Sequence, residues 1–243
     1  MEPPPSHLST KTIPPEERLI FALDLPDPEE ARRMVETLDE AVVFYKLGLE
    51  LFMAGGYLEL VDWLSGQGKK VFVDLKFFDI PETVASAVRQ LRRRPVTFAT
   101  VHGNDGILEA ACREKGEVKI LAVTALTSLD RGDLDDLGFQ VDVSRLVLSR
   151  ARRALELGCD GVISSGLEAL PLREELGERL IVVTPGIRPV DNRAVGDQKR
   201  VVSVEDAFRA GADYIVVGRP IRQAADPYRA ALDIQKTISG LFL

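Results

Sequence analysis

The chain has 243 residues, of which 45% are hydrophobic and 28% are charged, and its formal net charge is −7 at pH 7. That length suits one large domain, and the acidic balance argues against nucleic acids and membrane surfaces as partners. The two cysteines, Cys112 and Cys159, have no paired spacing, which is typical of a reducing compartment and not of a zinc site. No apolar run or leader pattern indicates a membrane span or secretion, so we expect a cytoplasmic protein.

Residues 1–17 are rich in proline and polar side chains, and we expect them to form a flexible tail ahead of a single domain, 18–243. Beyond the tail, short apolar runs alternate with amphipathic stretches, which predicts strands and helices in turn. The expected strands are 19–24, 42–46, 70–74, 96–101, 118–124, 160–163, 180–184 and 213–217. The expected helices are 27–38, 50–66, 81–93, 105–115, 142–157, 167–176, 204–210 and 220–238, with a short one near Leu134.

Eight strand–helix units in about 225 residues predict a (β/α)8 barrel, an α/β fold. An open doubly wound sheet is the alternative, but no G-x-G-x-x-G follows the first strand, where a dinucleotide-binding sheet needs one. Catalytic groups of such barrels come from the carboxyl ends of different strands. We therefore expect one rim to gather the polar residues at those ends, namely Asp24, Lys46, Asp74, Lys76, His102, Thr124, Thr127, Ser128, Ser164, Ser165, Thr184, Arg188, Gly218 and Arg219.

The stretch 70–83 carries the densest charge near a predicted strand end. Alternation places Asp74 and Lys76 on the same face of the strand, and Asp79 follows where the strand should end. With Lys46, these residues predict an alternating charge network that keeps the lysines protonated and suits proton donation. Mg²⁺ could bind the two aspartates, although the interleaved lysines disfavour it. An exposed surface pair is the alternative if the strand is not buried.

A second cluster follows the last predicted strand. Gly218 and Arg219 stand at the start of a helix, where barrels of this kind often bind phosphate. A helix-capping loop with a solvated arginine is the alternative. The long loop 185–200, which includes Arg188 and Gln198, has the basic residues expected of a lid that closes over an anionic ligand.

The stretch DLKFFDIPET, residues 74–83, resembles the D-x-K-x-x-D-I-x-x-T signature of the orotidine 5'-phosphate decarboxylase family. The resemblance continues, in the family's order and spacing, through residues 23–24, 45–48, 126–128, 185–188, 196–200 and 217–221. It implies a lyase that removes CO2 from orotidine 5'-monophosphate to give UMP, the last step of de novo pyrimidine biosynthesis. The family uses neither a metal nor an organic cofactor.

The resemblance also implies roles for single residues. Lys76 matches the proton donor to C6 of the pyrimidine, and Asp74 would lie beside the departing carboxylate. Asp79, Ile80 and Thr83 would reach into the site of a neighbouring subunit, which implies a homodimer with shared sites. The other implied substrate contacts are Asp24 and Lys46 on the ribose, Ser128 on the pyrimidine, Gln198 and Arg219 on the phosphate, and Thr127, Arg188 and Gly218.

Two alternative functions remain at this stage. A Mg²⁺-dependent sugar-phosphate decarboxylase or aldolase of the same superfamily shares the D-x-K-x-x-D core, but those relatives carry an acidic residue where Lys46 stands. A non-catalytic nucleotide-binding barrel is the other alternative. It is disfavoured because a buried cluster of aspartate and lysine destabilises a fold unless it has a use.

Overall fold

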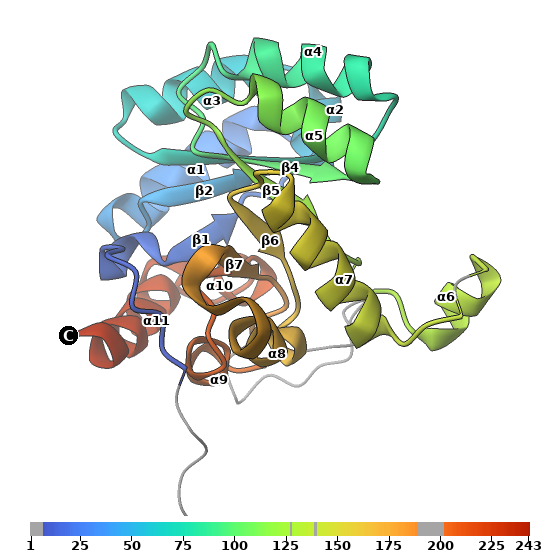
Figure 1. Cartoon of the computed structure of the whole chain (residues 1–243). Coiled ribbons are helices and arrows are strands. Elements are labelled where there is room, and N and C mark those ends of the chain that lie inside the picture. The colour runs from blue at the N-terminus through green and yellow to red at the C-terminus, as the bar shows by residue number, and fades with distance from the viewer. Residues whose placement is uncertain (1–6, 127, 139, 189–201) are drawn as a thin grey trace, which may run out of the picture.

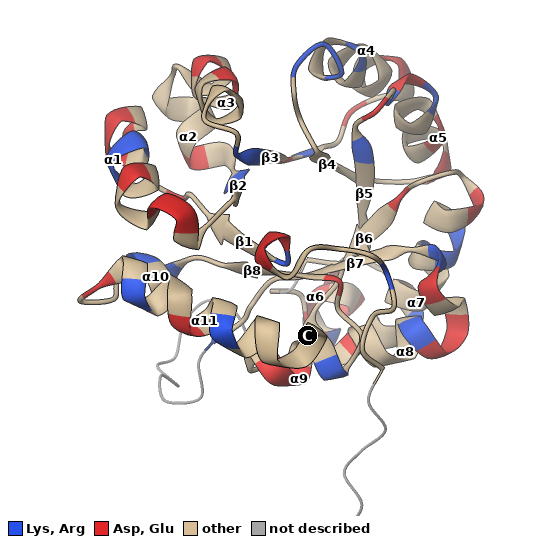
Figure 2. Cartoon of the chain, turned by 90° about the vertical axis from the view of Figure 1, so that its left-hand side faces the viewer, with Lys and Arg blue, Asp and Glu red and all other residues tan. Residues whose placement is uncertain are grey.

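A computed structural model of the chain describes residues 7–126, 128–138, 140–188 and 202–243. Strands at the centre of the molecule are surrounded by helices (Figure 1). Eight parallel strands close into a barrel in chain order, and β8 pairs with β1 (Figure 2). The helices lie outside the strands, and charged residues of both signs are spread over these helices (Figure 2). The predicted (β/α)8 barrel is therefore confirmed. Within the described ranges, no helix is long and apolar enough to cross a membrane.

The strands are β1 (Leu19–Ala22), β2 (Phe44–Leu47), β3 (Lys70–Phe77), β4 (Phe98–His102), β5 (Lys119–Val123), β6 (Gly161–Ile163), β7 (Ile181–Thr184) and β8 (Tyr214–Val217). The α-helices are α1 (Pro28–Leu38), α2 (Leu49–Ala54), α3 (Tyr57–Gly66), α4 (Pro81–Leu91), α5 (Asp105–Glu114), α6 (Arg131–Asp136), α7 (Val143–Glu156), α8 (Gly166–Leu176), α9 (Val204–Arg209), α10 (Arg219–Arg222) and α11 (Pro227–Phe242). Short 3-10 turns are η1 (Pro15–Glu17), η2 (Asp39–Ala41) and η3 (Gly177–Arg179).

Two of the predicted helices are each divided in the structure. The predicted helix 50–66 is interrupted at Gly55 and Gly56, whose φ angles of 86° and 65° are incompatible with a right-handed helix. The predicted helix 220–238 is α10 followed by α11, because the Asp226 side chain caps the amino end of α11 and starts a new helix there. Strand β3 is longer than predicted and reaches Phe77.

Aromatic side chains fill the inside of the barrel. The ring centroid of Phe98 lies 5.1 Å from those of Phe44 and Tyr214 and 5.9 Å from that of Phe72. These rings pack with aliphatic side chains of the other strands into an interior cluster separate from the core between strands and helices. The packed interior leaves polar side chains to the rim at the carboxyl ends of the strands.

The segment 7–17, which the sequence assigns to a flexible tail, lies against the opposite, amino-terminal rim. Asp213 is fully buried just before β8 and accepts hydrogen bonds from Ser9, Lys11 and Arg173. Its Oδ2 atom lies 2.5 Å from Arg173 Nη2 and 3.1 Å from Lys11 Nζ. We call these four side chains the N-terminal clasp, because they tie the start of the chain to its last strand.

Candidate active site

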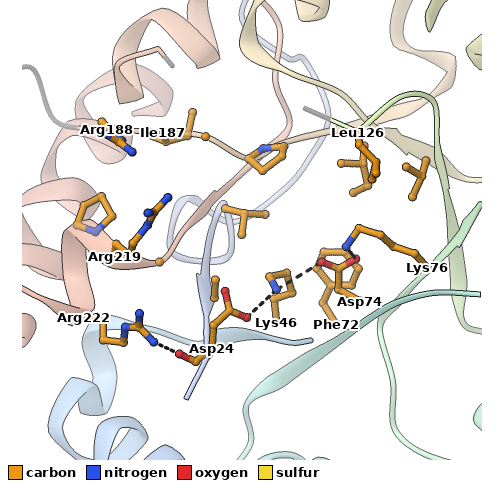
Figure 3. A pocket seen from close by; sticks show the side chains of 18 of the residues that line it. Asp24, Lys46, Phe72, Asp74, Lys76, Leu126, Ile187, Arg188, Arg219 and Arg222 are labelled. Carbon is orange, nitrogen blue, oxygen red and sulfur yellow. Dashed lines mark hydrogen bonds and ion pairs between the residues drawn. The ribbon is translucent and has the colours of Figure 1, made fainter. Parts of the chain in front are cut away.

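A cavity of about 400 Å³ opens at the carboxyl ends of the strands (Figure 3). Its walls come from segments far apart in the sequence, as expected for the catalytic rim of a barrel. Of the residues predicted for the site, the cavity is lined by Asp24, Lys46, Asp74, Lys76, Arg188, Gly218 and Arg219. The convergence expected from the strand ends is present for these seven residues.

Four of these side chains form an unbroken chain of opposite charges along one wall, which we call the charge cluster. Lys46 Nζ lies 3.1 Å from Asp24 Oδ1 and 3.4 Å from Asp74 Oδ2. Lys76 Nζ lies 2.9 Å from Asp74 Oδ1, on the other side of that carboxylate. Asp74 is therefore held between two ammonium groups (Figure 3).

The surroundings keep both central members of the cluster ionised. Burial by itself would raise the pKa of the Asp74 carboxyl, but the Lys46 and Lys76 ammonium groups, with hydrogen bonds from Lys76 and Thr100, hold that pKa below its usual value. Burial would likewise lower the pKa of Lys46, but the carboxylates of Asp74 and Asp24 outweigh it and raise the pKa. A neutral pH thus leaves a buried anion fixed by cations.

The alternation of strands β2 and β3 explains how the chain places this cluster. Phe44 and Phe72 point into the barrel, so Lys46 and Asp74, two residues later, point the same way at the rim. Lys76 does not follow this rule, because its φ is 49° and the β3–β4 ladder shifts register between Val73 and Phe77. A bulge, and not simple alternation, brings Lys76 against Asp74.

Thr100 on β4 is a member of the site that the sequence reasoning missed. It is fully buried, and its Oγ1 lies 2.9 Å from both the Lys76 backbone nitrogen and Asp74 Oδ1. Thr100 follows Phe98 by two residues on β4, just as Lys46 follows Phe44 by two residues on β2. The same spacing after an inward-facing phenylalanine was therefore a usable signal.

Arginines line the side of the cavity away from Lys76 (Figure 3). Arg188 follows β7, and Arg219 and Arg222 come from α10 directly after β8. Arg222, which the sequence reasoning also missed, donates a hydrogen bond to the backbone carbonyl of Asp24. It stands three residues after Arg219, so the two share a helix face. This side is suited to a phosphate or another compact anion.

Gly48 makes room for the charge cluster. A Cβ atom at this position would lie 3.2 Å from Asp24 Oδ1 and 3.3 Å from Lys46 Nζ, closer than most side-chain contacts allow. In the sequence, Gly48 is marked only by the family resemblance of residues 45–48, because its importance depends on where the two charged groups meet. Its missing side chain is thus part of the site geometry.

Other predicted site residues are not part of this cavity in the single chain. Asp79, Ile80 and Thr83 are exposed after β3, and Asp79 Oδ1 accepts a hydrogen bond from the Ile80 backbone nitrogen. Within the single chain, Lys46 pairs with Asp24 and Asp74, and a place for Asp79 in the network stays a prediction for an assembly of two chains. Ser128 is exposed outside the cavity lining. Thr127, Gln198 and loop residues 189–200 lie outside the described residues.

His102 lies beside the site, against the ring of Phe78 with centroids 5.2 Å apart. Burial, with the nearby cations Arg150 and Lys76, lowers the pKa of His102. Its buried Nδ1 has no hydrogen-bond partner among the residues that the structure describes. This environment gives a neutral imidazole outside the charge cluster. No three His, Cys, Asp or Glu side chains of the described ranges are grouped to hold a metal ion.

Fold and site together define a (β/α)8 barrel with a buried carboxylate–ammonium cluster facing an arginine-lined wall, the arrangement of an enzyme for a phosphorylated substrate. Comparison with known proteins shows which family of such enzymes the chain belongs to. The chain belongs to the orotidine 5'-phosphate decarboxylase / HUMPS family, whose sequence model matches residues 17–234.

Individual proteins similar to this chain have names that agree with this family assignment. The orotidine 5'-phosphate decarboxylase of Methylococcus capsulatus is 66% identical, over 98% of both chains. Its namesake in Xanthomonas oryzae is 50% identical over 91% of this chain and 92% of its own. The crystal structure of orotidine 5'-phosphate decarboxylase from Lactobacillus acidophilus, 36% identical, matches with a TM-score of 0.81 over 91% of this chain and 99% of its own. That from Pyrococcus horikoshii, 26% identical, matches with a TM-score of 0.73 over the same shares.

Proposed function

We propose that this chain decarboxylates orotidine 5'-monophosphate to UMP, the last step of de novo pyrimidine biosynthesis, as the names of its relatives indicate. The observation that carries the proposal is the Asp74 carboxylate fixed between Lys46 and Lys76, across the cavity from Arg188 and Arg219. This geometry holds a phosphate at one side and puts an ammonium group at the other. A phosphorylated pyrimidine carboxylate would therefore meet arginine side chains at its phosphate and the Lys76 ammonium group near its carboxylate.

Substrate capture uses the arginine side of the cavity. Arg219 and the backbone at Gly218 bind the phosphate, with Arg188 adding a contact. Gln198 is assigned to the phosphate from the family resemblance alone. Asp24 and Lys46 bind the ribose from the near wall. From the family resemblance alone, we assign the pyrimidine ring to Ser128 and a further substrate contact to Thr127. Binding energy collected at the phosphate is then available to hold the ring against the charge cluster.

The chemical step takes place at Lys76. The bond from C6 to the carboxylate breaks, CO2 leaves, and the electron pair stays on C6 as a carbanion without a conjugated sink. The ammonium of Lys76, preorganised by Asp74, stabilises this charge and donates a proton to C6. The lysine afterwards regains a proton from solvent. Asp74, ionised because its pKa is lowered, lies beside the departing carboxylate.

The donor set of the site favours a reaction without a metal. In the charge cluster, Asp24 and Asp74 are already engaged by the ammonium groups of Lys46 and Lys76. A divalent cation at these carboxylates would have to displace Lys46 against its own positive charge. We therefore assign no metal and no organic cofactor to the reaction.

We also propose a homodimer with shared sites. Exposed apolar side chains follow the neighbouring strands β2 and β3, and they include Phe52, Met53, Phe78 and Ile80. Phe78 and Ile80 are 67% and 68% exposed, and a second chain that covered them would remove this apolar surface from water. They flank Asp79, so a second chain that covers the patch receives Asp79 at its own rim. We place this enzyme in the cytoplasm, in keeping with its low cysteine content.

Mixing two inactive variants tests the shared site. A dimer of one Lys76→Ala chain and one Asp79→Ala chain keeps one intact site, in which Lys76 comes from one subunit and Asp79 from the other. Random exchange should restore about a quarter of wild-type activity, since half of the dimers are hybrids and each has one intact site. Activity that stays at the level of the separate variants would contradict the arrangement.

The decisive test of the reaction is the ultraviolet absorbance of orotidine 5'-monophosphate with purified protein and EDTA, run beside Lys76→Ala. We expect the wild type alone to form UMP, and Lys76→Ala to bind UMP without turnover. If the wild type bound UMP but gave no product, the proposal would fall. Mg²⁺ with pentulose phosphates would then separate a sugar-phosphate enzyme from a binding-only barrel.

A further inference from the structure

The bulge in β3 leaves the Lys76 backbone in need of a partner. With φ at 49°, Lys76 sits in the left-handed region, and the ladder with β4 is interrupted between Val73 and Phe77. Its backbone N–H donates to Thr100 Oγ1 at 2.9 Å. A side chain on the neighbouring strand therefore supplies the acceptor that the irregular ladder does not.

The direction of the second Thr100 hydrogen bond follows from chemistry. Because Oγ1 accepts from the Lys76 N–H, and because the ionised carboxylate of Asp74 can only accept, the single hydroxyl proton points to Asp74 Oδ1, 2.9 Å away. The same Oδ1 atom accepts from Lys76 Nζ at 2.9 Å. Thr100 is completely buried, so water does not compete for either bond.

We propose that Thr100 is a positioning residue: its hydroxyl ties the Lys76 backbone to the Asp74 carboxylate and so sets where the Lys76 ammonium points. Thr100 orients the proton donor without touching the substrate itself. It fixes Asp74 with Oδ1 toward Lys76 and Oδ2 toward Lys46. The role of Lys76 in turnover rests on the function proposed above, whereas the hydrogen-bonded geometry does not.

Loss of the hydroxyl should therefore affect turnover more than binding. In Thr100→Val, a side chain of nearly the same shape leaves the Lys76 N–H without its acceptor and Asp74 without one donor. We expect kcat to fall about ten- to a hundredfold with KM changed less than threefold, because the phosphate contacts lie across the cavity. Thr100→Ser keeps the hydroxyl and should retain wild-type kcat within about threefold.

The titration of Asp74 gives a readout that a general packing role would not move. The charged or titratable groups around its carboxylate are Lys46 on β2, Lys76 on β3 and Tyr57 on α3, with Asp24 beyond Lys46. A hydrogen bond to the ionised carboxylate lowers its pKa, so removing the bond raises it. The acid limb of kcat against pH should therefore move to higher pH in Thr100→Val and stay in place in Thr100→Ser.

The experiment combines these variants with a matched control and an activity-free signal. Ser9→Ala removes a buried hydroxyl of the N-terminal clasp, which donates to Asp213 at the opposite rim of the barrel, and should keep wild-type kcat. Carbon-13 NMR of aspartate-labelled protein follows the Asp74 carboxyl, identified by its absence in Asp74→Asn. The pH midpoint of the Asp74 carboxyl should rise in Thr100→Val and stay unchanged in Thr100→Ser and in the control.

Each outcome decides one of the two claims. An unchanged Asp74 midpoint with unchanged kcat in Thr100→Val overturns the positioning role, and so does an equal loss of kcat in Ser9→Ala. If the wild type fails to decarboxylate orotidine 5'-monophosphate, the proposed function is lost. The Asp74 midpoints of Thr100→Val and Thr100→Ser still decide the link between Thr100 and the carboxylate.

Discussion

At the scale of single residues, Lys76 combines an ion-paired side chain at the candidate site with an unfavourable backbone conformation. Only two residues other than glycine in the described part of the chain have a positive φ, Asp39 and Lys76. A left-handed conformation costs an ordinary residue about 1–2 kcal/mol. The chain keeps this strain where it gives Lys76 Nζ its contact with Asp74, as strained residues often lie at functional sites.

A comparison of glycine and alanine at this position measures that strain. We expect the free energy of unfolding of Lys76→Gly to be about 1 kcal/mol higher than that of Lys76→Ala, because glycine adopts a positive φ without strain. Both variants lack the ammonium group. Urea unfolding of both variants checks the difference. At the exposed helical residue Lys236 the order should reverse, because glycine is the poorer helix former there. The same order at both positions would contradict a strained Lys76.

His102 provides a pH prediction with a defined sign. Its pKa is lowered in the folded chain, so between that value and the ordinary value near 6.5 the unfolded state binds a proton that the folded state does not. Stability should therefore fall as pH drops through this window, and His102→Asn should reduce the fall. With two histidines in the chain, proton NMR resolves the imidazole that is missing from His102→Asn. A midpoint for His102 at or above 6.5 would contradict the assignment.

The sequence predicts the residues of the site better than their contacts. Lys46, Asp74 and Lys76 are recognisable because charge at buried strand ends is unusual. Thr100 and Gly48 are ordinary residue types whose roles arise from the β3 bulge and from the closeness of two charged groups, neither of which has a local pattern. Contacts between distant segments escape prediction for the same reason.

At the scale of elements, the turn from β8 into α10 places Arg219, the residue proposed to bind the phosphate. Gly218 lies against β1, where a Cβ atom would be 3.2 Å from that of Ala22, and Arg219 follows as the first residue of α10. The order of strands and helices follows from periodicity, and all eight strands are predicted within a few residues. The break between α10 and α11 is missed because the cap at Asp226 looks like an ordinary helical aspartate.

The arginine at this turn should act in capture. In Arg219→Ala we expect kcat/KM to fall at least a hundredfold, mostly through a higher KM, because a charge-assisted contact to the phosphate is lost. Steady-state kinetics on orotidine 5'-monophosphate measures the split. Arg229→Ala on α11, which removes an exposed arginine paired with Asp233, is the charge-matched control and should leave kcat/KM unchanged. An unchanged kcat/KM in Arg219→Ala would refute the phosphate assignment.

At the scale of the whole molecule, the candidate active site and the N-terminal clasp lie at opposite ends of the barrel. The charge cluster occupies the carboxyl-terminal rim, whereas the N-terminal clasp closes the amino-terminal rim around Asp213. Asp213 also accepts from the Val182 backbone nitrogen at 2.8 Å, which links β7 to the clasp. Changes in the clasp should therefore alter unfolding and leave the active site intact.

Two variants separate the buried and outer parts of the clasp. Asp213→Asn leaves the buried Arg173 without its carboxylate and should cost about 3–5 kcal/mol of unfolding free energy. Lys11→Ala removes the more exposed partner and should cost less than about 1 kcal/mol. Urea unfolding measures both, and kcat at low denaturant should be unchanged. If Lys11→Ala lost as much unfolding free energy as Asp213→Asn, burial would not explain the stabilising effect of the clasp.

Closure of the barrel has a consequence for how the chain folds during translation. Strand β1 needs β8 as one of its two partners, and Ser9 meets Asp213 across 204 positions of the chain. Throughout most of translation, the growing sheet therefore presents two unpaired edges, which are prone to pair with other chains. The arginine side of the cavity also emerges last. A chain that stops short of β8 is for this reason an open sheet at risk of aggregation, without an enzyme's site.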